Sequence, residues 1–584
     1  MKKSICKILN CKVFIVILMA VFTYSTFCFQ DVLKVYDLSS WLIFISLILL
    51  FYKTDIYNKN HKTDIILLSI LFSFLTVFGR IIYNFQSDAV YSCFSELFSF
   101  RSLVYIVGFF NIFYILLTII FPKLCELELK NGEQLINNKY IVFIISFLII
   151  FLAWVPYFLT FYPGLLSPDS FSEIKIIVNN FSSISDHHPV LHVLLVAIPF
   201  NIGMRMFSNI NSAVALVSTA QMIIMASIFS YLIVFLHSRK VNKIILTLIM
   251  LFYAFVPMHG YYSVTMWKDV IFSGILVLVT IQTFEISELV NKNILTFKNL
   301  IPFILISILC VFFRNNAIYM YIFLFIVTIL IFKRYLKQFF IAFFIIFGVY
   351  FFVKGPIFNY FSITKSGSAE YIGIPLQQIG RMAYKKVNFS DEELELLNKL
   401  MLVESIAKNY NPKTSDGIKF NSDYNADEFD KNKLKYFKLW LQLVKKHPAI
   451  ALEAYATSTL GYWYPGVEYW SVLNSISENE FNIYSDSKSN DFVLKLIENT
   501  EKRTTPILNI EWSIGLCFWI IFVFSIITLK KRGIKYLYPY VPIAGTWITM
   551  MVASPVYSEF RYVYGAFTCF PLLLMVPYIK IKDK

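Results

Sequence analysis

The chain has 584 residues, of which 58% are hydrophobic and only 15% are charged. An average soluble domain carries about 25% charged residues, so a soluble fold cannot hide this much apolar surface. The formal net charge is +15, but the lysines and arginines form short clusters between apolar runs, which is typical of topology-setting charges. We therefore expect a multi-pass protein of the cell membrane that contacts membrane lipid and has no nucleic-acid partner.

The N-terminal part of the chain begins with a basic segment that contains Lys2, Lys3, Lys7 and Lys12. An apolar run over residues 13–29 follows it, and no small-residue cleavage pattern ends that run. We expect an uncleaved first membrane span. Because basic clusters face the cytoplasm, both termini are predicted to be cytoplasmic.

Apolar runs recur along the whole chain, and about 20 apolar residues suffice to cross a bilayer. They predict about fourteen transmembrane helices, near residues 13–29, 41–52, 64–83, 103–121, 140–160, 212–236, 244–258, 269–284, 299–313, 316–332, 338–353, 513–528, 536–553 and 560–579. The run 190–206 is expected to dip into the membrane or lie at its interface. If it crossed, every later basic cluster, beginning with Arg239 and Lys240, would lie outside.

This topology divides the chain into five parts: N-terminal transmembrane helices (1–160), an outer catalytic loop with juxtamembrane helices (161–211), central transmembrane helices (212–353), an extracytoplasmic domain (354–512) and C-terminal transmembrane helices (513–584). The predicted fold class is an all-α polytopic membrane protein whose extracytoplasmic domain is mainly helical and precedes the last three helices. In that domain Ser390 is the expected N-cap of a helix that starts at Asp391, and His447-Pro448 is expected to break a later helix.

The loop that follows residue 160 contains the first candidate catalytic residues. Ser167 is a suitable N-cap, Pro168 suits the first helical position, and Asp169 complements the helix dipole. Asp169 and Glu173 are four residues apart and would share one helix face. We predict a catalytic carboxylate pair there, and the alternative for Asp169 is helix capping alone. An apolar stripe of the same helix is suited to lie on the membrane surface: Phe171, Ile174, Val178 and Phe181.

Further along the same loop lie Asp186, His187 and His188, just before Pro189. Imidazole and carboxylate groups bind divalent ions and also form hydrogen bonds with phosphates and sugars. His187 and His188, together with Asp169, are candidate ligands of a divalent metal, the one cofactor that the sequence suggests. The alternative is a polar, solvated entry to the next helix.

Charged residues also border the predicted spans on the outer side. Ionisable groups at such positions are functional candidates, and the alternative is an interfacial charge that snorkels to water. An arginine can hold a phosphate by paired hydrogen bonds. The predicted substrate-binding residues are Asp186, His187, His188, Lys268, Asp269, Arg314, Arg381, Glu559, Arg561 and Tyr562.

Four short motifs carry a resemblance to a known superfamily: Asp169, His188-Pro189, Lys268-Asp269 and Glu559-Phe560-Arg561-Tyr562. In order and spacing they resemble the GT-C superfamily of membrane glycosyltransferases, which includes the aminoarabinose transferases of lipid A and the protein O-mannosyltransferases. Residues 161–191 and 374–381 look closest to an uncharacterised bacterial branch of it. The chain departs from the usual pattern because Ser170 stands where a second acid is common, and because about five spans precede the loop.

The resemblance implies an enzyme that transfers a sugar from a polyprenyl-phosphate donor to a glycan, lipid or protein acceptor of the cell envelope, at the outer face. Asp169 would act as general base on the acceptor hydroxyl. Glu173 or the histidines would orient the acceptor or an ion. The leaving phosphate would be neutralised by Lys268, Arg314, Arg381 and Arg561.

Three other functions stay open on the sequence. A lipid-linked polysaccharide polymerase or ligase would use the same kind of donor. A transporter or flippase would place polar residues at broken helices near the bilayer midplane, whereas the charges here gather at the predicted outer boundary. A non-catalytic surface assembly protein would tolerate substitution of Asp169 and the histidines.

Overall fold

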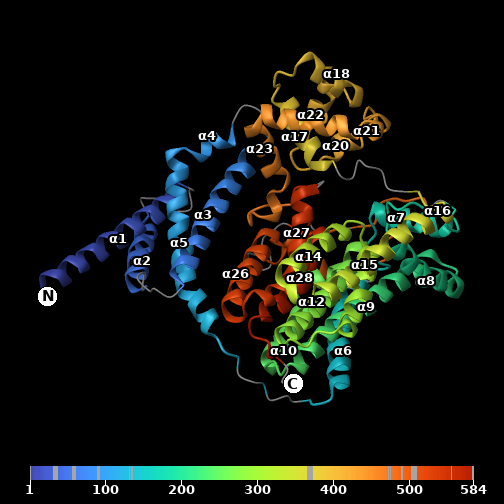
Figure 1. The fold of residues 1–584 in the computed structure, drawn as a ribbon, viewed down its shortest axis with the longest axis horizontal. Helices are drawn as coiled ribbons and strands as arrows, with labels where there is room; N and C mark the ends of the chain where they lie inside the picture. The colour runs from blue at the N-terminus through green and yellow to red at the C-terminus, as the bar shows by residue number, and fades with distance from the viewer. Residues whose placement is uncertain are drawn as a thin grey trace. The chain divides into compact units, whose positions relative to one another are not determined.

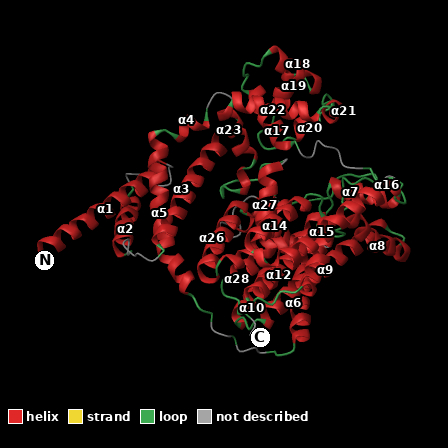
Figure 2. Ribbon diagram, viewed as in Figure 1, coloured by secondary structure: helices red, strands yellow, loops and turns green. Residues whose placement is uncertain are grey.

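The computed structural model describes residues 2–29, 37–54, 61–88, 92–129, 132, 136–182, 184–364, 372–470, 472–473, 475–487, 491–501, 510–553 and 556–581. These residues form helices joined by loops (Figure 2), and the only β-structure among them is a few isolated bridges. The predicted all-α fold class is confirmed.

A helix lies at every position where the apolar runs predict a membrane crossing. Within the described residues, eight helices are long and apolar enough to cross a membrane, or up to nine if the bent pair of residues 243–263 is one span. The chain is therefore a multi-pass α-helical membrane protein. One of the eight is Val190–Phe207, the run predicted to stay at the interface, so by length and composition it qualifies as a span. The total of about fourteen crossings stays a prediction.

The chain divides into two compact units. The first unit consists of Met1–Leu127, Ile372–Val467 and Pro555–Ser558. Its helices are α1 (Lys2–Phe29), α2 (Leu38–Lys53), α3 (Lys62–Phe85), α4 (Cys93–Leu97), α5 (Phe100–Glu126), α17 (Gly373–Tyr384), α18 (Asp391–Leu400), α19 (Val403–Asn409), α20 (Asp416–Lys419), α21 (Ala426–Lys431), α22 (Lys433–Lys446), α23 (Pro448–Ser458) and the short η5 (Leu460–Tyr462).

Within the first unit, α3 packs along α5, and α17 packs along α23 (Figure 1). Ser390 caps α18, because its side chain accepts a hydrogen bond from the Glu393 amide, and α22 ends at His447, where Pro448 starts α23. Both local predictions are confirmed. The helix expected over 391–408 is interrupted, with α18 ending at Leu400 and α19 starting at Val403.

The second unit consists of Glu128–Tyr371, Glu468–Ser554 and Glu559–Lys584. Its α-helices are α6 (Lys139–Thr160), α7 (Pro168–Val178), α8 (Val190–Phe207), α9 (Ile210–Ser238), α10 (Lys243–Phe255), α11 (Pro257–Ser263), α12 (Lys268–Asn291), α13 (Ile301–Phe313), α14 (Ala317–Ile331), α15 (Leu336–Phe352), α16 (Phe358–Tyr360), α24 (Asp491–Glu501), α26 (Ile514–Arg532), α27 (Val541–Ala553) and α28 (Phe560–Met575). Short turns of other helix types complete it: η1 (Phe297–Leu300), η2 (Lys333–Tyr335), η3 (Val353–Ile357), η6 (Ile510–Trp512) and η7 (Ile534–Tyr540).

The centre of the second unit is α12, whose apolar window is 89% buried within the protein. It packs along α9 and α28 (Figure 1) and also along α13. Because α12 and α28 both begin next to charged residues, Lys268-Asp269 and Glu559, their packing gathers charges that are distant in the sequence.

The two units divide the predicted extracytoplasmic domain, residues 354–512. Residues 372–467 belong to the first unit together with the N-terminal helices, whereas residues 468–512 belong to the second. The boundary at residue 354 also falls inside a continuous helical run, Lys333–Tyr360. Apolar patterning cannot predict such a division, since it depends on which helices pack together.

Candidate functional site

The start of α7 is held beside the start of α12. The Ser167 amide donates to Ser170 Oγ at 3.0 Å, and Ser170 Oγ in turn donates to the Met266 carbonyl at 2.7 Å. A short parallel bridge reinforces the contact, because the Leu165 amide donates to Val264 and the Met266 amide donates to Leu165, each at 2.9 Å. The predicted capping of α7 by Ser167 and Pro168 is confirmed. This arrangement brings Asp169 next to Lys268.

Asp169 is surrounded by positive charge. Its Oδ2 atom lies 3.2 Å from Arg561 Nη1 and 4.0 Å from Lys268 Nζ. Burial alone would raise the pKa of Asp169, but the charges of Lys268 and Arg561 outweigh burial and lower the pKa below its ordinary value. The Asp169 side chain keeps 34% of its surface exposed, so its ionised carboxylate is accessible to solvent and to a ligand.

Arg561 and Arg314 each have a carboxylate partner of their own. Arg561 Nε lies 3.3 Å from Glu559 Oε1. Arg314 Nη1 lies 3.1 Å from Asp269 Oδ1 and donates to the Tyr562 carbonyl at 2.8 Å. These pairs hold the guanidinium groups in place and leave Asp169 with a net surplus of positive charge around it.

Aromatic rings support the same arginines. Arg561 lies over the Trp267 ring at 5.3 Å, and Arg314 lies over the Tyr562 ring at 4.9 Å. Arg561 also lies over the Tyr562 ring at 5.1 Å, and Arg314 also lies over the Phe272 ring at 5.5 Å, and such contacts stabilise the two cations. The predicted residues Lys268, Asp269, Glu559 and Tyr562 thus meet around Arg314 and Arg561.

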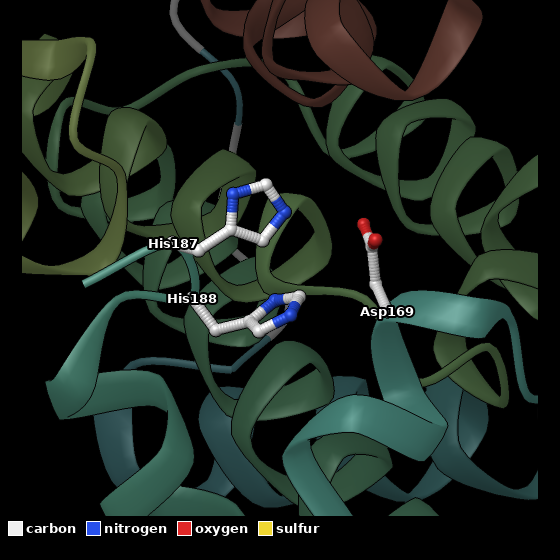
Figure 3. A group of neighbouring side chains, drawn as sticks. All are labelled: Asp169, His187 and His188. Atoms are coloured by element: carbon white, nitrogen blue, oxygen red, sulfur yellow. The ribbon is translucent and has the colours of Figure 1, made fainter. Parts of the chain in front are cut away.

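His187 and His188 lie opposite Asp169 (Figure 3). One ligand atom from each of these three side chains lies within 4.8 Å of the others. His188 is buried, and its Nδ1 atom has no hydrogen-bond partner among the described residues, whereas His187 is exposed. Burial lowers the pKa of His188 to about 4, and the nearby Lys268 adds to that shift, so the imidazole is neutral at physiological pH. The group has the residue types of a metal site.

Glu173 lies behind this group and not beside Asp169. It is 2% exposed, and its carboxylate is 2.9 Å from His192 Nδ1 and 3.9 Å from His188 Nδ1. Glu173 therefore does not form an exposed pair with Asp169, and the catalytic role predicted for the two carboxylates stays a prediction. Because α7 turns that side toward α8, Glu173 supports the two histidines from within the protein.

The apolar stripe predicted to lie on the membrane surface mostly faces the protein instead. Ile174 is buried in a cluster with residues of α8 and α9, such as Val193 and Val214, and Phe171 and Phe181 pack partly buried against that cluster. Val178, the fourth member of the stripe, is 46% exposed. The helix is instead fixed against two long helices, and this contact makes the position of Asp169 definite.

Asp186 is held by an ion pair with Lys354, whose ammonium also donates to Asn315 Oδ1 at 2.8 Å. Asn315 returns a hydrogen bond to the Asp186 carbonyl at 2.6 Å, and the Asp186 amide donates to Thr364 at 2.8 Å. Burial raises the pKa of Asp186, and the ion pair with Lys354 opposes that shift. Asp186 thus fixes the loop that carries His187 and His188, and it does not point into the Asp169 group.

Arg381 lies in the first unit and not with this group. It is 1% exposed, pairs with Glu453, and donates to the carbonyls of Gln86 at 2.8 Å and Asp88 at 2.9 Å. A guanidinium so occupied is a structural link between segments of the first unit. Its predicted role in phosphate binding has no support in this arrangement.

An apolar groove between α8 and α9 is lined along α8 from Met206 to His192. It has a volume of about 450 Å³ and is lined almost entirely by hydrocarbon side chains of these helices and by Ile271 of α12. Met206, in the last turn of α8, lines the groove and is 67% exposed. His192, in the first turn of α8, also lines it but is 1% exposed and pairs with Glu173. A hydrophobic chain in this groove would have its end near the buried side of the histidines.

A family model matches residues 177–582, and it describes DUF6020, a family of unknown function. The chain belongs to this family. No curated protein and no solved structure matches the chain. The DUF6020 match contains His187, His188, Lys268 and Arg561, and it begins after Asp169 and Glu173. The residues of the charged group therefore lie within the part of the chain that matches the family model, or just before it.

Sequence reasoning missed two members of the site. Trp267, which lies under Arg561, directly precedes Lys268 and could have been found from that position. The sequence marks Lys354, the partner of Asp186, only as the start of the predicted extracytoplasmic domain. Its signal was a lone cation directly after a long apolar run, and such a charge needs a partner when it is buried.

Proposed function

We propose that this DUF6020 protein is a membrane glycosyltransferase that moves a sugar from a polyprenyl-phosphate donor to a cell-envelope acceptor at the outer face of the cell membrane. The observation that carries the proposal is the apolar groove between α8 and α9, whose lining includes His192, the partner of the Glu173 carboxylate next to His188. A ligand that fits the groove and the charged residues has a long apolar tail and an anionic head group.

The head group of such a donor matches the charges of the site. Lys268 and Arg561 lie on one side of Asp169, and Arg561 can form two parallel hydrogen bonds with phosphate oxygens. In the proposed reaction both cations stabilise the negative charge that develops on the leaving phosphate. Removal of one such donor typically slows a reaction by about 10²–10³-fold.

Asp169 is the proposed general base. Its lowered pKa keeps it ionised at neutral pH, and part of its side chain is exposed to an incoming acceptor hydroxyl. When a donor phosphate engages Lys268 and Arg561, it shares the positive charge that otherwise holds Asp169 in its ionised form. The basicity of Asp169 then rises in the ternary complex.

A tryptophan pair offers a surface for the sugar. Trp470 is 41% exposed, and its ring lies 6.4 Å from that of Trp267, which supports Arg561. Aromatic faces stack on the apolar faces of sugar rings. A sugar on Trp470 would lie near the phosphate held by Arg561.

The test is sugar transfer by the purified full chain in lipid, from a panel of radiolabelled polyprenyl-phosphate sugars to envelope acceptors. Wild type is compared with Asp169→Asn and with Asp64→Asn, a matched control in the first unit. We expect label in an acceptor with wild type and Asp64→Asn only. Transfer by Asp169→Asn at the wild-type rate would remove Asp169 from the mechanism, and no transfer from any donor by folded protein would refute the proposed activity.

A transporter is the second candidate function, because one predicted span is broken. Helices α10 and α11 meet at an angle of 52° at Val256-Pro257, and His259 in α11 is fully buried. Broken helices with buried polar groups occur in secondary transporters. Flux of a lipid-linked sugar across liposomes without any new glycosidic bond would favour this function.

A further inference from the structure

We infer that Asp169, His187 and His188 bind one divalent transition-metal ion of the zinc class. The inference deepens the proposed function, since the ion would hold an oxygen of the donor phosphate. Binding of the ion can be measured without any donor or acceptor.

The residue types and their spacing fit such an ion. Two imidazoles and one carboxylate are a common ligand set for zinc at sites that keep one position open for water or substrate. The three ligand atoms lie within 4.8 Å of one another. Tetrahedral zinc with ligands at about 2.1 Å needs these atoms about 3.4 Å apart. His187 is exposed and can rotate to close that difference.

The surroundings of His188 fit those of a metal ligand. It is 4% exposed, and its Nδ1 atom has no hydrogen-bond partner among the described residues. Nδ1 faces the Glu173 carboxylate at 3.9 Å, which leaves Nε2 to face the ion. Histidine ligands of metals commonly donate their other ring N–H to a carboxylate, and that bond fixes the ring orientation. Glu173, itself held by His192, lies on that side of the His188 ring, at a distance of 3.9 Å that is too long for a hydrogen bond.

The loop that carries the histidines is fixed as a metal site requires. Asp186 pairs with Lys354 and is bound through its backbone to Asn315 and Thr364. The histidines that directly follow it are therefore placed by the protein before any ligand arrives.

The positive charges near Asp169 leave room for a cation. Both Arg561 and Lys268 approach the same oxygen, Oδ2, so Oδ1 is the atom assigned to the ion. Arg561 is also neutralised by Glu559 at 3.3 Å.

The experiment measures metal binding by the purified full chain in nanodiscs after removal of bound metal with a chelator. Zinc content is determined by mass spectrometry, and Co²⁺, which replaces zinc, reports its ligands through visible absorption. We expect one tightly bound ion per chain in wild type. His187→Ala and Asp169→Asn should lose it, whereas His61→Ala, a control in the first unit, should keep it.

Two further variants sharpen the result. Glu173→Gln should weaken zinc binding by about 10–100-fold and alter the Co²⁺ spectrum, as is usual for a residue that orients a ligand. Because His187 is exposed, we expect His187→Ala to fold. Its result is therefore decisive even if a variant of a buried residue does not fold. Wild type without a bound ion, or His187→Ala that binds as wild type does, would overturn the inference. Sugar transfer by metal-free protein would overturn the metal's role in the reaction and leave the proposed function standing.

Discussion

Arg561 Nη1 lies 3.2 Å from Asp169 Oδ2, although 392 positions separate the two residues in the chain. The contact joins the first turn of α7 to the first turn of α28. The proposed base, Asp169, and the proposed phosphate-binding residue, Arg561, therefore hold each other in place. A substitution of either residue is expected to change the position of the other.

Arg561→Gln should slow sugar transfer by about 10²–10³-fold, because the leaving phosphate loses its paired hydrogen bonds. Initial rates with a lipid-linked donor measure the effect. Arg101→Gln, which removes an exposed arginine of the first unit, serves as the control and should transfer at the wild-type rate. Equal rates for the two variants would exclude Arg561 from phosphate binding.

Ala220→Phe should block the groove between α8 and α9, where Ala220 is one of the lining residues. We expect a higher KM for donors with long polyprenyl chains and little change for donors with short chains, since only the long tail needs the groove. Ser227→Phe introduces the same ring on α9 outside the groove and should change neither KM. A KM increase that is independent of chain length would argue against a tail in this groove.

Lys354→Met should destabilise the protein by about 3–5 kcal/mol, because it leaves the Asp186 carboxylate buried without its partner. Unfolding of the protein in detergent measures the change. Adding Asp186→Asn to Lys354→Met should recover part of the stability. Lys399→Met removes an exposed partner of Glu395 and should have no measurable effect. If Lys354→Met and Lys399→Met have the same free energy of unfolding, the Asp186–Lys354 pair does not stabilise the fold.

Glu511 gives a prediction about pH. Burial raises the pKa of its carboxyl to about 8, from an ordinary value of about 4.5. The folded state therefore keeps a proton that the unfolded state releases, so this contribution to stability is full below about pH 4.5 and falls until about pH 8. The melting temperature of Glu511→Gln should fall less steeply as the pH rises over this range than the melting temperature of wild type. Parallel pH profiles for the two proteins would contradict the raised pKa.

Local signals in the sequence were enough to predict several elements. Ser167-Pro168 starts α7, Ser390 caps α18, and Pro448 separates α22 from α23, because capping and proline chemistry act within one turn. Apolar runs likewise predicted where the long helices lie. These features depend on neighbours in the chain and need no knowledge of the fold.

Contacts between distant segments could not be predicted. Periodicity places Glu173 and Asp169 on one side of α7, but only the packing of α7 on α8 shows that Glu173 is buried against His192. Arg381 looked like a phosphate ligand because its buried partner, Glu453, lies 72 positions away. The approach of Arg561 to Asp169 has the same origin, since it follows from the packing of α12 with α28.

If this DUF6020 protein is a glycosyltransferase, it forms a glycosidic bond and releases polyprenyl phosphate from a lipid-linked donor. The most direct measurement is mass spectrometry of donor and acceptor after incubation with purified protein in nanodiscs, with Arg561→Gln as the matched slow variant. We expect glycosylated acceptor and free polyprenyl phosphate in equal amounts with wild type, and about 10²–10³-fold less of both in the same time with the variant. Intact donor across the panel with folded wild-type protein would contradict the account.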